Sequence, residues 1–110
     1  MYVRRRGRMT RGQERALATL RERYCIDPKQ VTLDNAFEPR PTAAVKLGLE
    51  IGFGMGHATS HWAQQRPDMN LLGVEVYEPG IGALMSSLAE REIENVRIID
   101  GDARVVLEEW

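Results

Sequence analysis

Residues 49–56 read Leu-Glu-Ile-Gly-Phe-Gly-Met-Gly, an apolar stretch that runs into three glycines at alternate positions. In residues 45–51 apolar side chains alternate with polar or small ones, which is the period-2 pattern of a β-strand. Alternate glycines let the backbone turn sharply and approach a ligand closely, and a following helix presents its positive N-terminus there. The stretch therefore predicts a strand, a tight turn and a helix, with a nucleotide-like ligand at the carboxyl end of the strand.

The segments that follow continue this alternation. Residues 57–65 are long enough for a short helix, residues 71–76 form a mostly apolar strand, and residues 79–91 have the apolar face of a helix. Residues 96–99 predict a third strand, and residues 103–110 predict the start of another helix. Strands and helices at this spacing predict an α/β fold, with right-handed crossovers and a parallel sheet covered on both faces.

A helix and a connection are expected before this alternation. Residues 10–13 fit a capping box, and a helix should follow it. The apolar side chains of this helix fall on one face: Ala16, Leu17, Leu20 and Tyr24. The helix is expected to end near Asp27-Pro28, and residues 28–43 are expected to form an extended connection over the surface. The chain thus divides into residues 1–27, a basic arm and N-terminal helix, residues 28–43, and an α/β domain in residues 44–110.

The formal charge of −1 hides an uneven distribution. Residues 1–23 hold eight arginines and two glutamates, a balance of +6, so the rest of the chain carries −7. An arginine-rich arm favours phosphates, whereas an acidic body suits a small cationic ligand better than a polyanion. A solvated leader without a partner is the alternative. Contacts with phosphates are expected from Arg4, Arg5, Arg6 and Arg8.

The spacing of the glycines indicates which ligand the turn takes. They follow the pattern G-x-G-x-G, and His57 stands where the dinucleotide fingerprint G-x-G-x-x-G has its third glycine. The carboxylate of Glu50 would repel a pyrophosphate but attract the ammonium and sulfonium groups of S-adenosylmethionine. The pattern therefore disfavours a dehydrogenase and favours S-adenosylmethionine, with the cofactor at Gly52, Gly54 and Gly56.

Two further acids follow the next two strands. Glu75 ends the second strand, where a carboxylate can accept hydrogen bonds from both ribose hydroxyls. Asp102 follows the third strand and is placed to accept from the adenine amino group. Because the carboxyl ends of parallel strands meet at one edge of a sheet, Glu50, Glu75 and Asp102 together predict one cofactor site.

The remaining reactive side chains are interpreted as structural. Cys25 is the one cysteine of the sequence and is expected to pack at the end of the first helix. His57 and His61 lie four residues apart, but no further histidine or cysteine completes a site, so no metal is expected. The first arginines are not followed by an apolar run, so neither a signal peptide nor a membrane partner is expected. The chain is interpreted as cytoplasmic.

Two runs of this sequence resemble the bacterial tRNA (guanine-N7-)-methyltransferases of the TrmB type. The first is residues 49–56, and the more specific one is Gly73-Val74-Glu75-Val76-Tyr77-Glu78-Pro79-Gly80-Ile81-Gly82-Ala83-Leu84. Residues 3–10 resemble the basic leader of this family, and residues 95–102 resemble its third strand. The resemblance therefore covers nearly the whole chain.

The resemblance implies a Rossmann-like, S-adenosylmethionine-dependent methyltransferase fold with its first three strands in residues 44–110, a truncated cofactor-binding domain preceded by the basic helix. It implies that Glu50, Glu75 and Asp102 contact S-adenosylmethionine, and that S-adenosylhomocysteine is the product. The implied substrate is a guanine in the variable loop of tRNA, methylated at N7. The implied full-length enzyme is a monomer that acts on tRNA and not on DNA.

The chain resembles only the first part of this family. Family members continue into a fourth strand with an Asp-Pro-Trp-Pro-Lys-like motif and an acid near the target base, so catalytic residues are expected beyond residue 110 and none is assigned within it. Two alternatives stay open. One is a non-catalytic fragment that binds cofactor or RNA, and the other is a small-molecule methyltransferase that shares the glycine turn and the acids.

Overall fold

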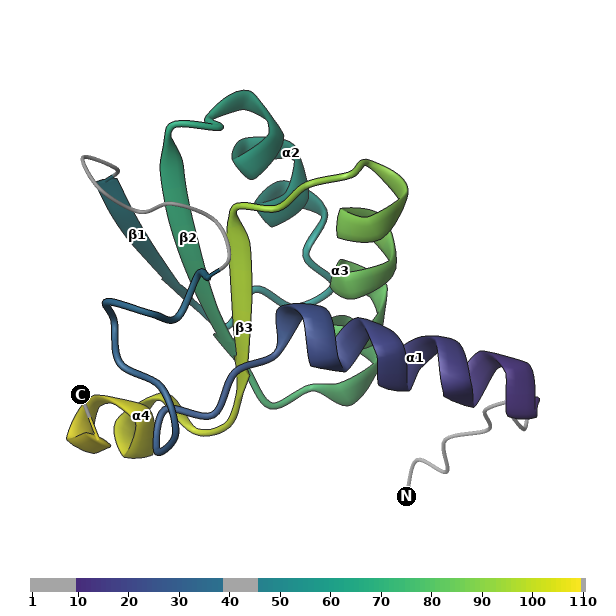
Figure 1. Ribbon diagram of the computed structural model, residues 1–110, viewed down its shortest axis with the longest axis horizontal. Helices are drawn as coiled ribbons and strands as arrows, with labels where there is room; N and C mark the ends of the chain where they lie inside the picture. Colours follow the sequence, from purple (N-terminus) through teal and green to yellow (C-terminus); the bar gives the residue numbers. More distant parts are fainter. Residues whose placement is uncertain (1–9, 39–45, 110) are drawn as a thin grey trace, which may run out of the picture.

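The computed structural model describes residues 10–38 and 46–109. Within these ranges, parallel strands form one sheet in the order β1-β2-β3, and helices lie around it (Figure 1). The elements are α1 (Arg11–Tyr24), β1 (Lys46–Ile51), α2 (His57–Gln65), β2 (Met69–Glu75), α3 (Glu78–Glu90), β3 (Val96–Asp100) and α4 (Ala103–Glu109). The predicted parallel α/β fold and the predicted order of its elements are confirmed.

The register of the strands brings their carboxyl ends to one edge of the sheet. β1 pairs with β2 up to Ile51 opposite Val74, and β2 pairs with β3 up to Glu75 opposite Asp100. Residues 70–74 of β2 are buried without interruption, as expected for a central strand covered on both faces. The segments that follow the strands, including the glycine turn after β1, therefore begin at the same edge.

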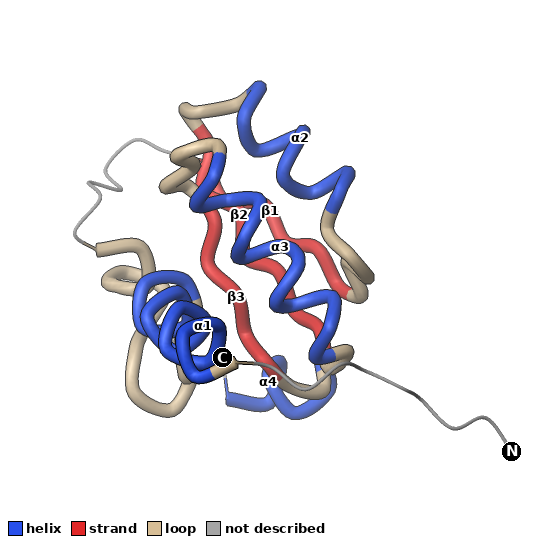
Figure 2. Tube along the Cα trace, turned by 90° about the vertical axis from the view of Figure 1, so that its right-hand side faces the viewer, coloured by secondary structure: helices blue, strands red, loops and turns tan. Residues whose placement is uncertain are grey.

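One face of the sheet is covered by α1, α2 and α3, with α3 between the other two helices (Figure 2). Tyr24 of α1, Leu84 and Leu88 of α3, and Ile98 of β3 are fully buried in this core. Burial of each such aliphatic side chain contributes roughly 2 kcal/mol to folding. This layer fixes the start of α3 against the edge of the sheet where the strands end.

The other face is covered by residues 26–38 and α4. Ala36 and Phe37 are buried against Leu72 and Val74 of β2 and Ile99 of β3, together with Val106 of α4. The residues between Asp27 and Glu38 form hydrogen-bonded turns, whereas the sequence predicted an extended connection over the surface. Phe37 is only 1% exposed, so this segment contributes to the core as well as connecting two elements.

The start of α1 follows the prediction. The Thr10 hydroxyl accepts a hydrogen bond from the Gln13 N–H at 3.0 Å, and the Gln13 side chain accepts from the Thr10 N–H at 2.9 Å. These two bonds form the predicted capping box. Leu17 and Leu20 pack against the core as predicted, but Ala16 is exposed. The predicted apolar face is therefore correct for the larger side chains and wrong for Ala16.

The end of α1 differs from the prediction. The helix ends at Tyr24, before the predicted end near Asp27-Pro28, and Cys25 already has extended backbone angles. Cys25 pairs with Ile98 as an isolated parallel bridge, and the Ile26 N–H donates to the Ile98 carbonyl at 2.9 Å. Pairing with the edge of β3 thus ends the helix earlier than proline would.

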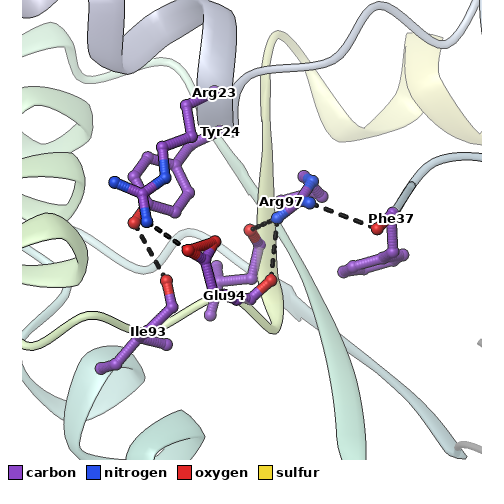
Figure 3. A network of polar contacts seen from close by, with 7 residues as sticks. Arg23, Tyr24, Phe37, Ile93, Glu94 and Arg97 are labelled. Atoms are coloured by element: carbon purple, nitrogen blue, oxygen red, sulfur yellow. Dashed lines mark hydrogen bonds and ion pairs between the residues drawn. The ribbon is translucent and has the colours of Figure 1, made fainter. Parts of the chain in front are cut away.

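Side chains at the start of β3 join the two layers (Figure 3). On one side, the Tyr24 hydroxyl donates to the Ile93 carbonyl at 3.0 Å and Arg23 forms an ion pair with Glu94. On the other side, the buried guanidinium of Arg97 donates to the carbonyls of Glu94 at 2.9 Å and Phe37 at 3.3 Å. A buried cation requires such acceptors, so these contacts fix residues 36–38 to the sheet.

Asn95 holds the connection between α2 and β2. Its side-chain N–H group donates to the carbonyls of Ala63, Arg66 and Met69 at 2.9–3.0 Å, and the residue is buried. The carbonyls of Ala63 and Arg66 also accept the backbone N–H groups of Arg66 and Met69, so the Asn95 side chain adds a second hydrogen bond to each of them. Asn95 therefore fixes the position of α2 relative to the start of β3.

Candidate functional site

The glycine turn after β1 has the conformation that its sequence requires. Gly52, Gly54 and Gly56 have φ angles of 73°, 63° and 79°, in the left-handed region that side chains other than glycine rarely adopt. A Cβ atom built on Gly52 or Gly54 would meet nothing within 4 Å, whereas one on Gly56 would lie 2.7 Å from the Leu84 Cβ. The first two glycines therefore expose backbone to open space, and the third allows α2 to begin against α3.

Glu75 joins the end of β2 to this turn. The Gly54 N–H donates to Glu75 Oε1 at 2.6 Å, and the N–H groups of Val76 and Tyr77 donate to Oε2 at 3.0 and 3.1 Å. Desolvation opposes ionisation, but the N–H groups of Gly54, Tyr77 and Val76 together outweigh it and lower the pKa of Glu75 below its ordinary value. The carboxylate is thus held ionised against the turn.

These bonds limit what Glu75 can accept from a ligand. An ionised carboxylate offers about four acceptor positions, and backbone N–H groups fill three of them here. In this arrangement one position is left for a ligand hydroxyl. Acceptance from both ribose hydroxyls, as predicted from the sequence, would require the ligand to replace one backbone donor or share its acceptor.

Glu50, the acid in front of the glycines, contacts α2. The Thr59 hydroxyl donates to Glu50 Oε1 at 2.5 Å, and Thr59 is buried while Glu50 is partly exposed. Glu50 lies opposite Gly73 in β2, one residue pair before the end of the β1 ladder. The structure therefore places Glu50 at the base of the turn, with its orientation set by a side chain of the following helix.

The start of α3 packs closely on the glycine turn. A Cβ atom built on Gly80 would lie 1.8 Å from the Gly54 carbonyl oxygen, closer than any side chain tolerates. Gly80 lies in the first turn of α3, which begins at Glu78. The absence of a side chain at Gly80 is what lets α3 and the turn approach, and the backbone of residue 54 holds both this contact and the bond to Glu75.

Asp102 lies at the same edge but has other partners. Its Oδ1 accepts from the Arg104 N–H at 2.8 Å, and its Oδ2 lies 3.3 Å from the Arg104 guanidinium. The Arg104 side chain, followed by the Arg104 N–H, lowers the pKa of Asp102 below its ordinary value. The structure thus brings Glu75 and Gly54 into contact, places Glu50 at the same turn, and pairs Asp102 with the start of α4.

Arg21 of α1 reaches the same edge. Its guanidinium lies 2.7 Å from Glu78 at the start of α3 and 3.4 Å from Asp100 at the end of β3. Both ion pairs are partly exposed, and exposed pairs contribute little to stability. Their effect is positional, because they fix the end of α1 beside the start of α3 and the end of β3.

Residues 44–110, more than half of the chain, match a family described as "Putative methyltransferase". The chain belongs to this methyltransferase family. The parallel sheet between helices is accordingly that of a Rossmann-like methyltransferase fold, as predicted from the sequence. The glycine turn and the acids at the ends of β1 and β2 lie within the matched residues.

Curated relatives of this chain carry the name tRNA (guanine-N(7)-)-methyltransferase. The protein of Acidovorax sp. (strain JS42) is 50% identical over 111 residues, which cover 97% of this chain and 42% of the relative. The protein of Ralstonia pickettii (strain 12J) is 48% identical over 108 residues, which cover 96% of this chain and 41% of the relative. The resemblance seen in the sequence is confirmed, and the chain spans about two fifths of the length of these relatives.

Three contacts that position the residues of this site were not predicted from the sequence. Thr59 and Arg21 lie in helices, where no local pattern marks them as partners of distant acids. Gly80 directly follows Pro79 at a helix start, and a glycine in this position is a signal for close backbone approach. These contacts arise from tertiary packing.

The remaining sequence predictions concern the basic leader, the two histidines and membrane-spanning helices. Arg4, Arg5, Arg6 and Arg8 lie outside the described residues. His57 and His61 are exposed on α2, and in residues 10–38 and 46–109 no group of His, Cys, Asp and Glu side chains is placed to hold a metal ion. The helices of the described part are too short or too polar to cross a membrane.

Proposed function

We propose that this chain supplies the S-adenosylmethionine-binding part of a tRNA (guanine-N7)-methyltransferase. The observation that carries the proposal is the contact between Glu75 and the Gly54 N–H, which joins the acid after β2 to the glycine turn after β1. Parallel sheets bind nucleotide-like ligands outside the carboxyl ends of their strands. The names of the curated relatives support the same reaction.

The residues present fit this cofactor. Gly52 and Gly54 face open space where a ligand can approach the backbone. The Glu75 carboxylate is ionised and has acceptor capacity left for a ribose hydroxyl. We assign the ammonium end of the cofactor to Glu50 and the adenine amino group to Asp102, which would exchange part of its contact with Arg104 for the ligand.

The cofactor supplies an activated methyl group on its sulfonium. Guanine N7 has an available lone pair, so transfer requires in-line positioning and exclusion of water more than a strong base. The part of this chain in the reaction is to hold and orient the cofactor through the acids and the glycine turn. The acid near the target base is proposed to lie outside residues 1–110.

The basic leader is proposed to bind tRNA phosphates through Arg4, Arg5, Arg6 and Arg8. The support is the balance of +6 in residues 1–23. Deletion of residues 1–9 should weaken tRNA binding and reduce the dependence of log K on log salt by about 0.7–0.9 for each lost contact. Unchanged affinity and slope would rule out this role. The proposal includes a cytoplasmic, monomeric full-length enzyme that acts on tRNA.

The proposed function is tested by calorimetric titration of the chain with S-adenosylhomocysteine, alongside Glu75→Ala and Glu90→Ala. Glu90→Ala serves as the control, because it removes the same charge from an exposed position at the carboxyl end of α3, whereas Glu75 lies close to the amino end of that helix. We expect saturable binding by the wild type and Glu90→Ala, and at least a tenfold loss in Glu75→Ala. Absence of binding by a folded wild-type chain, or preference for NADH, would contradict the proposal.

A further inference from the structure

Thr59 lies in the first turn of α2, directly behind the glycine turn. It is 2% exposed, and its hydroxyl donates to Oε1 of Glu50 at 2.5 Å. Glu50 is itself only partly buried and precedes the first glycine of the turn by two residues. The buried hydroxyl of Thr59 in α2 thus contacts the acid that β1 presents near the carboxyl ends of the strands.

The direction of this bond is fixed by its chemistry. An ionised carboxylate only accepts hydrogen bonds, so the threonine must donate. The branched Cβ of threonine restricts its rotamers in a helix, and burial removes the alternative of pointing to water. Hydrogen bonds to a charged group are shorter and stronger than neutral ones. Because this bond uses one carboxylate oxygen, the other oxygen can accept from a ligand.

We propose that Thr59 is a positioning residue for the amino-acid end of the ligand. It holds Glu50 so that the free carboxylate oxygen meets the ammonium group of S-adenosylmethionine. This inference rests on the proposed function and assigns recognition of one end of the ligand to one residue pair. The adenosine end does not depend on Thr59, because Glu75 is held by backbone N–H groups of Gly54, Val76 and Tyr77.

The test compares two ligands that share the adenosine and its thioether. S-adenosylhomocysteine carries the amino-acid group, and 5′-methylthioadenosine lacks it. The affinities of the wild type, Thr59→Val and Thr59→Ser for both ligands are measured by calorimetry. The affinity for the more weakly bound ligand is obtained from a competition titration. We expect Thr59→Val to bind S-adenosylhomocysteine about tenfold more weakly, the loss of one hydrogen bond to a charged group. Its affinity for 5′-methylthioadenosine should stay within about twofold of the wild type.

Thr59→Ser keeps the hydroxyl and should bind both ligands within about threefold of the wild type. If Thr59→Val does not fold, Thr59→Ser is compared with Thr59→Ala, since these two variants differ by one oxygen atom. In a Glu50→Gln background the valine substitution should have no further effect. A further tenfold loss in that background would show that the hydroxyl does not act through Glu50.

Two results would overturn the inference while leaving the proposed function intact. The first is that Thr59→Val binds S-adenosylhomocysteine with the affinity of the wild type. Where Thr59→Val does not fold, the equivalent result is that Thr59→Ala binds this ligand as tightly as Thr59→Ser. The second is an equal loss for both ligands, which would mark Thr59 as a purely structural residue. Failure of the folded wild-type chain to bind S-adenosylhomocysteine would instead overturn the proposed function.

Discussion

Replacement of Gly80 by alanine tests whether the position of the glycine turn depends on its contact with α3. The added Cβ would lie 1.8 Å from the Gly54 carbonyl oxygen, and side chains do not come closer than 3.0 Å to such an atom. The turn or the helix must therefore move by at least about 1.2 Å, the difference between these distances. Because the N–H of Gly54 also binds Glu75 at 2.6 Å, that hydrogen bond should be strained or lost.

The expected size of the effect follows from two opposing contributions. Forcing an extra methyl group into a packed contact costs about 1–3 kcal/mol, while alanine in place of glycine in a helix gains up to about 1 kcal/mol. The net loss of about 1–2 kcal/mol should lower the melting temperature by roughly 5–10 °C. The displaced turn should also weaken S-adenosylhomocysteine binding at least tenfold, since about 1 Å of misplacement is costly in a preorganised site.

Gly82→Ala is the matched control in the same helix. A Cβ built there would lie 3.7 Å from Leu17 Cδ2, an ordinary van der Waals contact. This variant should melt at or a few degrees above the wild-type temperature and bind the ligand normally. Thermal melting by circular dichroism and calorimetric titration measure both quantities. If Gly80→Ala melts with Gly82→Ala and binds equally well, the reasoning from close backbone contact is wrong.

Three further predictions concern other contacts. Because the pKa of Glu75 is lowered in the folded chain, its contribution to stability is present above about pH 4.3 and is lost as the pH falls through the lower folded value. The difference in melting temperature between the wild type and Glu75→Gln should therefore shrink over that pH interval. A difference that does not depend on pH would contradict this prediction. Asn95→Ala removes the side-chain donor shared by three carbonyls, two of which keep a backbone N–H donor, and should reduce the free energy of unfolding by about 1–3 kcal/mol, seen as a lower urea midpoint with an unchanged slope. Burial raises the pKa of the Cys25 thiol, so Ellman's reagent at pH 8 should react at least about tenfold more slowly with the native chain than with the chain in urea, and equal rates would show an open thiol.

Periodicity and local chemistry were sufficient for the order and type of the elements. The capping box at Thr10, the apolar strands and the glycine turn are all encoded within a few residues of one another. The sequence reading failed where a tertiary contact competed with a local signal. Asp27-Pro28 is a typical helix end, but the hydrogen bond from the Ile26 N–H to the Ile98 carbonyl requires the helix to end before these residues.

The candidate site was predictable in its acids and not in their partners. Acids after parallel strands converge on one edge of the sheet whatever the details of packing, so Glu50 and Glu75 could be named. Backbone N–H groups occupy most of the Glu75 carboxylate because of the way α3 starts after Tyr77. The spacing of apolar residues in the sequence does not predict this local conformation. Phe37 belongs to the same class, because a single aromatic residue among turns gives no pattern from which burial can be predicted.

The two lateral edges of the sheet, which are the outer sides of β1 and β3, are not equivalent. The edge of β3 away from β2 is occupied by the chain itself, through the pairing of Cys25 and Ile26 with Ile98. On β1, at the opposite edge, Leu47, Leu49 and Ile51 are 49%, 52% and 54% exposed. Open strands are templates for further pairing, and a strand already paired on both sides is not. Among the described residues, the outer side of β3 is paired at Ile98 and the outer side of β1 pairs with no strand, so we expect an additional strand to join the sheet at β1.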